Sequence, residues 1–535
     1  VAAAIALATC GTRDSARPLL AALTDADPLV AQAAAMAIEN LTCHVEPTYN
    51  AFAPPAERSA QVQRWKAWMQ QDTWAAVEKR LIERLQSGDR DAARRAAVAM
   101  GHVGDSDAVR QALRAYVAAE APKNPFPEWR KRYRGDGARF NSLSEANPRT
   151  LQAAVRALGY LHDEASVDML AKAIADNSDS TNGNLFLAEA AAEALGNIGT
   201  PRAQDALVAS LAGLRDYFYY TGWYGDHSAL FACHACPVHY FIAAGLDECG
   251  STRAGEIIPN LIRSVPTDPD RALMLATDDC ETLVGRVIRR SGGEAAVTET
   301  CLAILGDKQA QADKDIDQAI RTTYKAWAGK PDPENRAAHI LSLLCRDRSY
   351  EPRIAAALDR YRQTDVPKDL VRAFGGGGLP RATPVKHWVC FYLARELGNL
   401  ADSRLATATA EQRQARAATV DTLLAVLEDC PPEAAAGRPA ADDPAALFLH
   451  NDLTPCYRSA AAWALGRIGD RRAAPVLLKI VGDFANAPDT RHAAAEALGR
   501  INDPASRMAI RRLAADYPDF ATRRALLRAA AGAVH

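Results

Sequence analysis

Apolar and small residues recur at three- and four-residue spacing in many segments of this chain, and short polar turns separate these segments. The residues that share one helical face between positions 459 and 469 are Ala461, Ala464, Leu465 and Ile468. Gly469 fits the left-handed end of a helix, and Asp470 fits the N-cap of the next, because a carboxylate accepts hydrogen bonds from free backbone N–H groups. The pattern predicts a helix that ends at a Gly-Asp turn and packs through small side chains.

The sequence motif that contains this turn, Ala-Leu-Gly followed by a Gly-Asp or similar turn, recurs along the chain. The segment 464–470 reappears at 497–503, and weaker forms stand at 157–159, 194–196 and 100–101. Gly466 and Gly499 lie 33 residues apart, which is the length of a bare two-helix unit. The repetition predicts an all-α fold, a right-handed α-α superhelix of stacked helix pairs.

The repeated glycine lies inside its helix rather than after it. A glycine there costs about 1 kcal/mol relative to alanine. A close helix crossing would offset that cost, so we expect neighbouring helices to approach one another at Gly159, Gly196, Gly398, Gly466 and Gly499.

Long insertions interrupt the repeats. If the two helices of a unit are called A and B, the B-to-A links are short turns and the A-to-B links are long. The long links are 121–147, 177–184, 213–236, 363–382 and 430–454. Units that stack in one orientation place all their A-to-B links on one edge. The exception is 43–73, a B-to-A insertion whose Trp65 and Trp68 are predicted to pack against the array rather than to form an exposed pair.

The Ala-Leu-Gly phrase resembles the HEAT repeats, in the short form often called phycobilin-lyase HEAT-like. The resemblance is clearest at residues 90–110, 148–210 and 455–520, and it implies an α-superhelix. The iron-binding deoxyhypusine hydroxylases of this fold use His-Glu pairs, and none of the 11 histidines here is followed by Glu. The chromophore chemistry of the lyases maps onto no specific residue of this chain.

Four segments follow from the pattern. Residues 1–120 form N-terminal repeats that begin mid-repeat, because Val1 to Thr9 match a second helix; a secretory signal is the alternative, without a basic leader before it. Residues 121–310 are central repeats, 311–382 are irregular repeats with a Gly-rich hinge, and 383–535 are C-terminal repeats.

Composition narrows the function classes. Lys and Arg number 63 against 65 Asp and Glu, so the net charge of -2 creates no field that attracts nucleic acid. The same balance argues against a HEAT-like DNA glycosylase. The longest apolar stretches fall short of the roughly 20 residues of a membrane span, so we expect no membrane insertion. The 11 scattered cysteines favour buried thiols and a cytoplasmic location, with export left open.

The insertion 213–236 is rich in aromatic residues, which are typical anchors of binding surfaces. The candidate binding residues there are Tyr217, Tyr219, Tyr220, Trp223, Tyr224 and His227. Cys233 and Cys236 have the C-x-x-C spacing of zinc and redox sites, and His239 is a candidate third ligand. The alternatives are a disulfide or redox pair, and an aromatic loop that packs against the array.

A second insertion carries a basic run with aromatic residues between the charges. Its candidate binding residues are Trp129, Arg132 and Arg134, which suit phosphate or an acidic partner. The sequence as a whole predicts a noncatalytic scaffold that binds a protein partner, or another domain of its own polypeptide, and needs no cofactor. The alternatives are an accessory module of an enzyme, with zinc or another metal near Cys233 and Cys236, and nucleic-acid binding.

Overall fold

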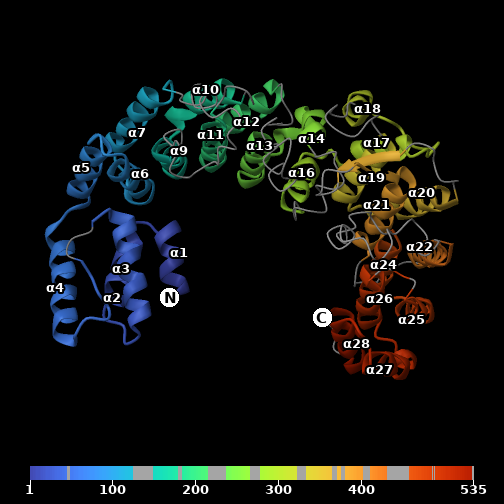
Figure 1. The fold of residues 1–535 in the computed structure, drawn as a ribbon. Coiled ribbons are helices and arrows are strands. Elements are labelled where there is room, and N and C mark those ends of the chain that lie inside the picture. Colours follow the sequence, from blue (N-terminus) through green and yellow to red (C-terminus); the bar gives the residue numbers. More distant parts are fainter. Residues whose placement is uncertain are drawn as a thin grey trace. The chain divides into compact units, whose positions relative to one another are not determined.

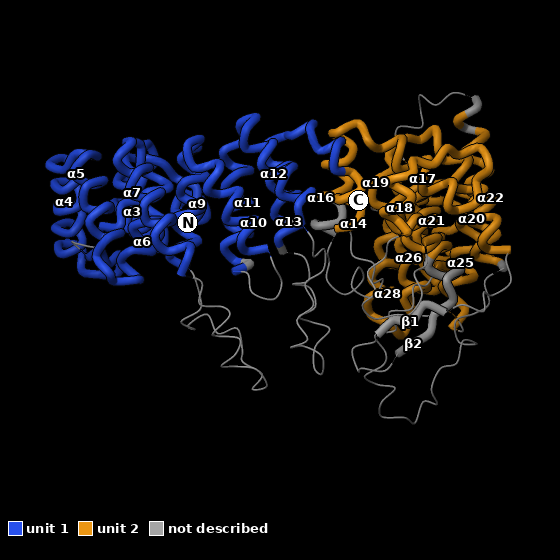
Figure 2. The backbone as a smooth tube through the Cα atoms, turned by 90° about the horizontal axis from the view of Figure 1, so that it is seen from above, with its two compact units in different colours: residues 1–223, 234–257 blue, residues 224–233, 258–535 orange. Residues whose placement is uncertain are grey.

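A computed structural model describes most of the chain. The described residues are 1–44, 48–123, 149–178, 184–214, 237–264, 278–321, 333–363, 370–374, 380–401, 410–429, 457–484, 486 and 488–532. They form two compact units. Those up to Ile257 belong to unit 1, and those from Ile258 onward belong to unit 2 (Figure 2).

Unit 1 consists of helices in two layers. Its elements are α1 (Ala2–Cys10), η1 (Arg13–Ser15), α2 (Ala16–Ala22), α3 (Pro28–Thr42), α4 (Pro55–Gln71), α5 (Trp74–Leu85), α6 (Arg90–Val103), α7 (Asp107–Glu120), α9 (Arg149–Tyr160), η2 (Glu164–Ser166), α10 (Val167–Asn177), α11 (Leu185–Ile198), α12 (Pro201–Gly213), α13 (Pro237–Glu248) and η5 (Arg253–Ile257). The B layer runs through α1, α3, α6, α9, α11 and α13, each packed on the next, and α5, α7, α10 and α12 follow one another in the A layer (Figure 1).

Unit 2 repeats this arrangement. Its elements are α14 (Ile258–Ser264), α16 (Asp278–Arg290), α17 (Glu294–Ile304), α18 (Lys314–Arg321), α19 (Pro333–Leu344), η6 (Arg348–Tyr350), α20 (Glu351–Gln363), β1 (Leu370–Phe374), β2 (Pro380–Pro384), α21 (Val385–Asn399), α22 (Ala410–Asp429), α24 (Tyr457–Ile468), η9 (Arg471–Ala473), α25 (Ala474–Gly482), α26 (Pro488–Ile501), η10 (Pro504–Ser506), α27 (Arg507–Ala515) and α28 (Phe520–Ala531). The B layer runs through α16, α19, α21, α24, α26 and α28. The predicted all-α solenoid of helix pairs is confirmed.

The turns between successive helix pairs have the predicted chemistry. Gly469 adopts a positive φ of 77° after α24, and the Asp470 carboxylate accepts a hydrogen bond from the Arg472 backbone N–H at 2.9 Å. The equivalent turn after α26 uses Asn502, with φ of 48°, and Asp503. Asparagine tolerates this left-handed backbone better than most residues do.

The glycines inside B helices mark close helix crossings, as predicted. A Cβ atom added at Gly159 would lie 2.6 Å from the Ala194 Cα atom, and one at Gly466 would lie 2.7 Å from the Ala497 Cα atom. No real side chain tolerates such distances, so the close approach of the backbones requires glycine. At Gly499 the two helices also pack but approach less closely than expected, because the nearest atom to an added Cβ is the Ala529 Cβ at an ordinary 3.5 Å.

These crossings also fix the direction of the helices. Gly159 packs on Ala194, which stands two residues before Gly196, and Gly466 packs on Ala497, which stands two residues before Gly499. Each contact joins the C-terminal part of one B helix to the C-terminal part of the next, so the helices point the same way. Within each unit, the N-terminal ends of these B helices therefore lie along one edge, which is where the A-to-B links arrive.

The A-to-B link after α20 contains the strands β1 and β2. They pair antiparallel, with Val371 opposite Thr383 and Ala373 opposite Arg381. We did not expect strands from the sequence, and α21 begins at Val385, directly after β2. The four glycines 375–378 stand between the strands in the sequence and lie outside the described residues.

The boundary between the units falls at residues 257 and 258, inside the segment 121–310 that the sequence groups as one set of repeats. The division of the chain into four segments, which is based on the regularity of the repeats, remains a prediction. Within the described part of the chain, every helix is too short or too polar to cross a bilayer.

Candidate functional site

The predicted binding residues of the insertion 213–236 lie outside the described residues. So do Trp129, Arg132 and Arg134, and the two cysteines of the C-x-x-C pair. The structure describes the helices that flank the aromatic insertion, α12, which ends at Gly213, and α13, which begins at Pro237.

His239 is the one member of the predicted metal site that the structure describes. Its side chain is buried in the first turn of α13, and this burial lowers the pKa of His239 to about 3. The imidazole is therefore neutral at pH 7, which is the form that binds metals. Among the described residues, no group of three or more His, Cys, Asp or Glu side chains is arranged to hold a metal ion.

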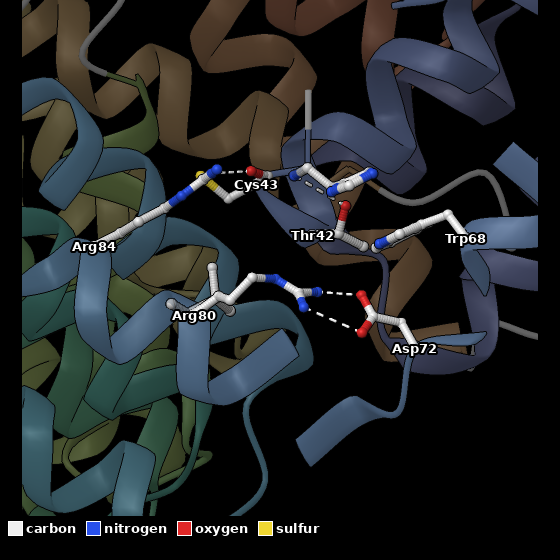
Figure 3. A pocket seen from close by; sticks show the side chains of 8 residues that line it. Thr42, Cys43, Trp68, Asp72, Arg80 and Arg84 are labelled. Atoms are coloured by element: carbon white, nitrogen blue, oxygen red, sulfur yellow. Dashed lines mark hydrogen bonds and ion pairs between the residues drawn. The ribbon is translucent and has the colours of Figure 1, made fainter. Parts of the chain in front are cut away.

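A pocket lies beside α5, where the B-to-A insertion 43–73 meets the array (Figure 3). We call it the α5 pocket. Its volume is about 480 Å³, and the residues that line it are Thr42, Cys43, His44, Trp68, Asp72, Arg80, Leu81 and Arg84. They come from the end of α3, the end of α4 and one face of α5, all within unit 1.

The first wall of the α5 pocket is the irregular end of α3. Cys43 adopts a left-handed backbone with φ of 51°, which is unfavourable for a residue with a Cβ atom. Two contacts hold it there. The Arg84 Nη1 donates a hydrogen bond to the Cys43 carbonyl and lies 3.1 Å from the Cys43 Sγ. The His44 N–H donates to the Thr42 Oγ1 at 3.3 Å.

The second wall is aromatic. The His44 ring stacks on Trp68 with ring centroids 4.0 Å apart and an interplanar angle of 8°, and Trp65 meets both rings edge-on at 5.5 Å. Trp65 is fully buried, whereas Trp68 is half-buried. The prediction that the two tryptophans pack against the array is confirmed, and Trp68 also lines the pocket.

The third wall carries the charges. Arg80 and Arg84 stand four residues apart and therefore lie on the same face of α5. Arg80 forms a bidentate pair with Asp72, in which Nη1 lies 3.1 Å from Oδ1 and Nη2 donates to Oδ2. The hydrogen bond from Arg80 is the main cause that lowers the pKa of Asp72, so this carboxylate stays ionised.

His44 titrates far below its usual range. Partial burial is the main cause, and the positive charge of Arg80 and Arg84 adds to it, so the pKa of His44 falls to about 4. The Nε2 atom of His44 is buried and has no hydrogen-bond partner among the described residues. The ring is therefore neutral at pH 7 and keeps one unused hydrogen-bonding atom.

This lowered pKa predicts a pH dependence. An unfolded chain protonates His44 near pH 6.5, whereas the folded chain resists protonation until about pH 4, so the free energy of unfolding should fall as the pH drops from 6.5 towards 4. We expect His44→Gln to remove this share of the pH dependence, measured as the difference in denaturation midpoint between pH 7 and pH 5. An NMR titration that gives His44 a pKa near 6.5 would contradict the prediction.

Sequence reasoning missed the α5 pocket. The signal available was the pair Arg80 and Arg84 at helical spacing, next to an insertion rich in tryptophan. The pairing of Arg80 with Asp72 joins α5 to the end of α4, and the pairing of Arg84 with Cys43 joins α5 to the end of α3, so both depend on where these helix ends lie relative to α5. No local pattern encodes these contacts.

The sequence model of HEAT repeats matches residues 138–217 and 443–531. These regions are therefore HEAT repeats, and the resemblance of the Ala-Leu-Gly phrase to that family is confirmed there. The chain is an α-solenoid that carries HEAT repeats. No curated protein matches it in sequence.

Several solved structures are similar to this chain. Human deoxyhypusine hydroxylase in complex with glycerol is 16% identical, covers 79% of this chain and 97% of its own, and has a TM-score of 0.21. Importin beta is 14% identical over 94% of this chain and 59% of its own, with a TM-score of 0.34. A structure concerning the interaction between cadherin and beta-catenin is 12% identical over 96% and 90%, with a TM-score of 0.26.

Proposed function

We propose that this protein is a noncatalytic scaffold that binds a protein partner, or another domain of its own polypeptide, through its A-to-B edge. The observation that carries the proposal is the common direction of the B helices within each unit. Because of it, the long A-to-B links are joined to helix ends that share one edge. Solenoids of stacked repeats typically bind partners through extended surfaces of this kind.

The aromatic insertion before α13 is the proposed centre of this edge. Its tyrosines and tryptophan offer a large contact area with polar ends, which is typical of the residues that dominate binding energy. The basic insertion that contains Trp129, Arg132 and Arg134 is proposed to add contacts to acidic groups of the partner.

The test replaces residues 215–236 with a Gly-Ser linker of equal length and compares the proteins that the variant and the parent chain capture from cells of the source organism. We expect the linker variant to lose a partner that the parent retains. The control, Glu248→Ala with Thr252→Ala, changes one exposed residue at the C-terminal end of α13 and one in the turn that follows it, and should keep the partner. Capture that survives the linker, with the helical circular dichroism unchanged, contradicts the proposal.

The second candidate function is that of an accessory module of an enzyme, with a metal or redox site in the aromatic insertion. The neutral, buried imidazole of His239 is the observation that favours it. Zinc would bind the Cys233 and Cys236 thiolates together with His239 and would fix the fold of the insertion. The same capture experiment with Cys233→Ser and Cys236→Ser, alongside elemental analysis, separates the two candidates. If the insertion holds zinc, the variants should lose both the metal and the partner. If the protein is a scaffold without metal, the parent chain should contain no zinc and the variants should still capture the partner.

A further inference from the structure

The α5 pocket has the size of a small-molecule site. Its volume of about 480 Å³ falls within the range of roughly 300–1,000 Å³ that ligand pockets occupy. Its walls come from the ends of α3 and α4 and from one face of α5, all within unit 1.

The charges around the α5 pocket do not cancel. Asp72 neutralises Arg80 through two hydrogen bonds. Arg84 has no such partner, because its Nη1 donates to the carbonyl and thiol of Cys43, and none of the described carboxylates pairs with it. One guanidinium therefore supplies an uncompensated positive charge, and a guanidinium can pair with a planar anion through two parallel hydrogen bonds.

The rest of the wall is mostly apolar and aromatic, with two buried polar atoms that have no hydrogen-bond partner in the described part of the chain. Leu81 is buried and Trp68 is half-buried beneath its stack with His44. The buried Nε2 of His44 has no hydrogen-bond partner, and an unsatisfied polar atom of this kind costs about 1–3 kcal/mol. The Nε1 of Trp68 is also buried without a hydrogen-bond partner among the described residues.

We propose that the α5 pocket binds a small organic monocarboxylate. The carboxylate pairs with Arg84, and the apolar body of the ligand packs against Trp68 and Leu81. A single negative charge matches the one uncompensated guanidinium, whereas a phosphate dianion leaves a surplus negative charge beside Asp72. This ligand site uses no residue of the insertion 213–236, so the proposal does not rest on the proposed partner binding.

The test uses benzoate as the probe, benzamide as its neutral analogue and inorganic phosphate as the dianion. Each is titrated into the full chain, and the indole N–H resonance of Trp68, assigned with Trp68→Phe, is followed by NMR. We expect benzoate to shift this resonance saturably, and we expect benzamide and phosphate to bind at least tenfold more weakly. This comparison needs no variant at the charged wall.

The variant Arg84→Met should weaken benzoate binding at least tenfold, and the control Arg512→Met, at an exposed arginine of α27, should leave it unchanged. If Arg84→Met does not fold, the comparison of benzoate with benzamide decides alone. No saturable shift with benzoate at millimolar concentration overturns the proposal. Equal binding of benzamide or phosphate overturns it as well, because it removes the role of a single charge.

Discussion

Gly466→Ala should lower the free energy of unfolding by about 2–3 kcal/mol, even though alanine forms helices better than glycine by about 1 kcal/mol. The added methyl group would lie 2.7 Å from the Ala497 Cα atom and 2.8 Å from the Ala497 Cβ atom. Because both helices are packed in the B layer, α24 and α26 must move apart to admit it. Urea denaturation followed by circular dichroism measures the change.

Gly499→Ala is the matched control, because the residues from two before to two after the glycine are Ala-Leu-Gly-Arg-Ile in both cases. The added methyl group would meet the Ala529 Cβ atom at 3.5 Å, which is an ordinary contact. We expect this variant to be as stable as the parent, or more stable by up to about 1 kcal/mol. Equal effects of the two substitutions would show that the crossing distance does not determine the need for glycine.

Arg416→Met should lower the free energy of unfolding by about 3–5 kcal/mol, because it leaves a buried carboxylate without its cation. Arg416 on α22 holds Glu351 on α20 through a hydrogen bond from Nη2 to Oε2 at 2.8 Å and through an ion-pair contact of 2.7 Å between Nε and Oε1. Both side chains are less than a tenth exposed. Thr419 donates a further hydrogen bond to Glu351 at 2.8 Å.

The control for this prediction is Arg472→Met. Arg472 also pairs with a carboxylate, Asp421, at 2.7 Å, but the side chains are 47% and 64% exposed. Exposed pairs contribute about 0–1 kcal/mol, so this variant should unfold close to the parent. The double variant Glu351→Leu with Arg416→Met should recover much of the lost stability, because neither charge then remains buried alone. A small loss in Arg416→Met, similar to that in Arg472→Met, would contradict the role given to burial.

The helices and their turns were predictable because their signals are local. The Gly469-Asp470 turn follows from the left-handed tolerance of glycine and the capping ability of aspartate, both of which act within a few residues. The burial of Trp65 also follows from its place on an apolar helical face. By contrast, Gly466 and Gly499 lie in identical five-residue sequences, so the sequence does not show that the neighbouring helix approaches more closely at Gly466 than at Gly499.

The sequence by itself determined the class of this protein, an α-solenoid with HEAT repeats whose long links follow its A helices, because repeat length, helical periodicity and turn chemistry are encoded locally. Only the tertiary structure decided where a pocket forms, because the ends of α3 and α4 and the arginines Arg80 and Arg84 of α5 become neighbours only in the folded chain. It also decided which arginines are buried with a partner. Such contacts depend on the distance between packed helices, which the spacing of residues along the chain does not specify.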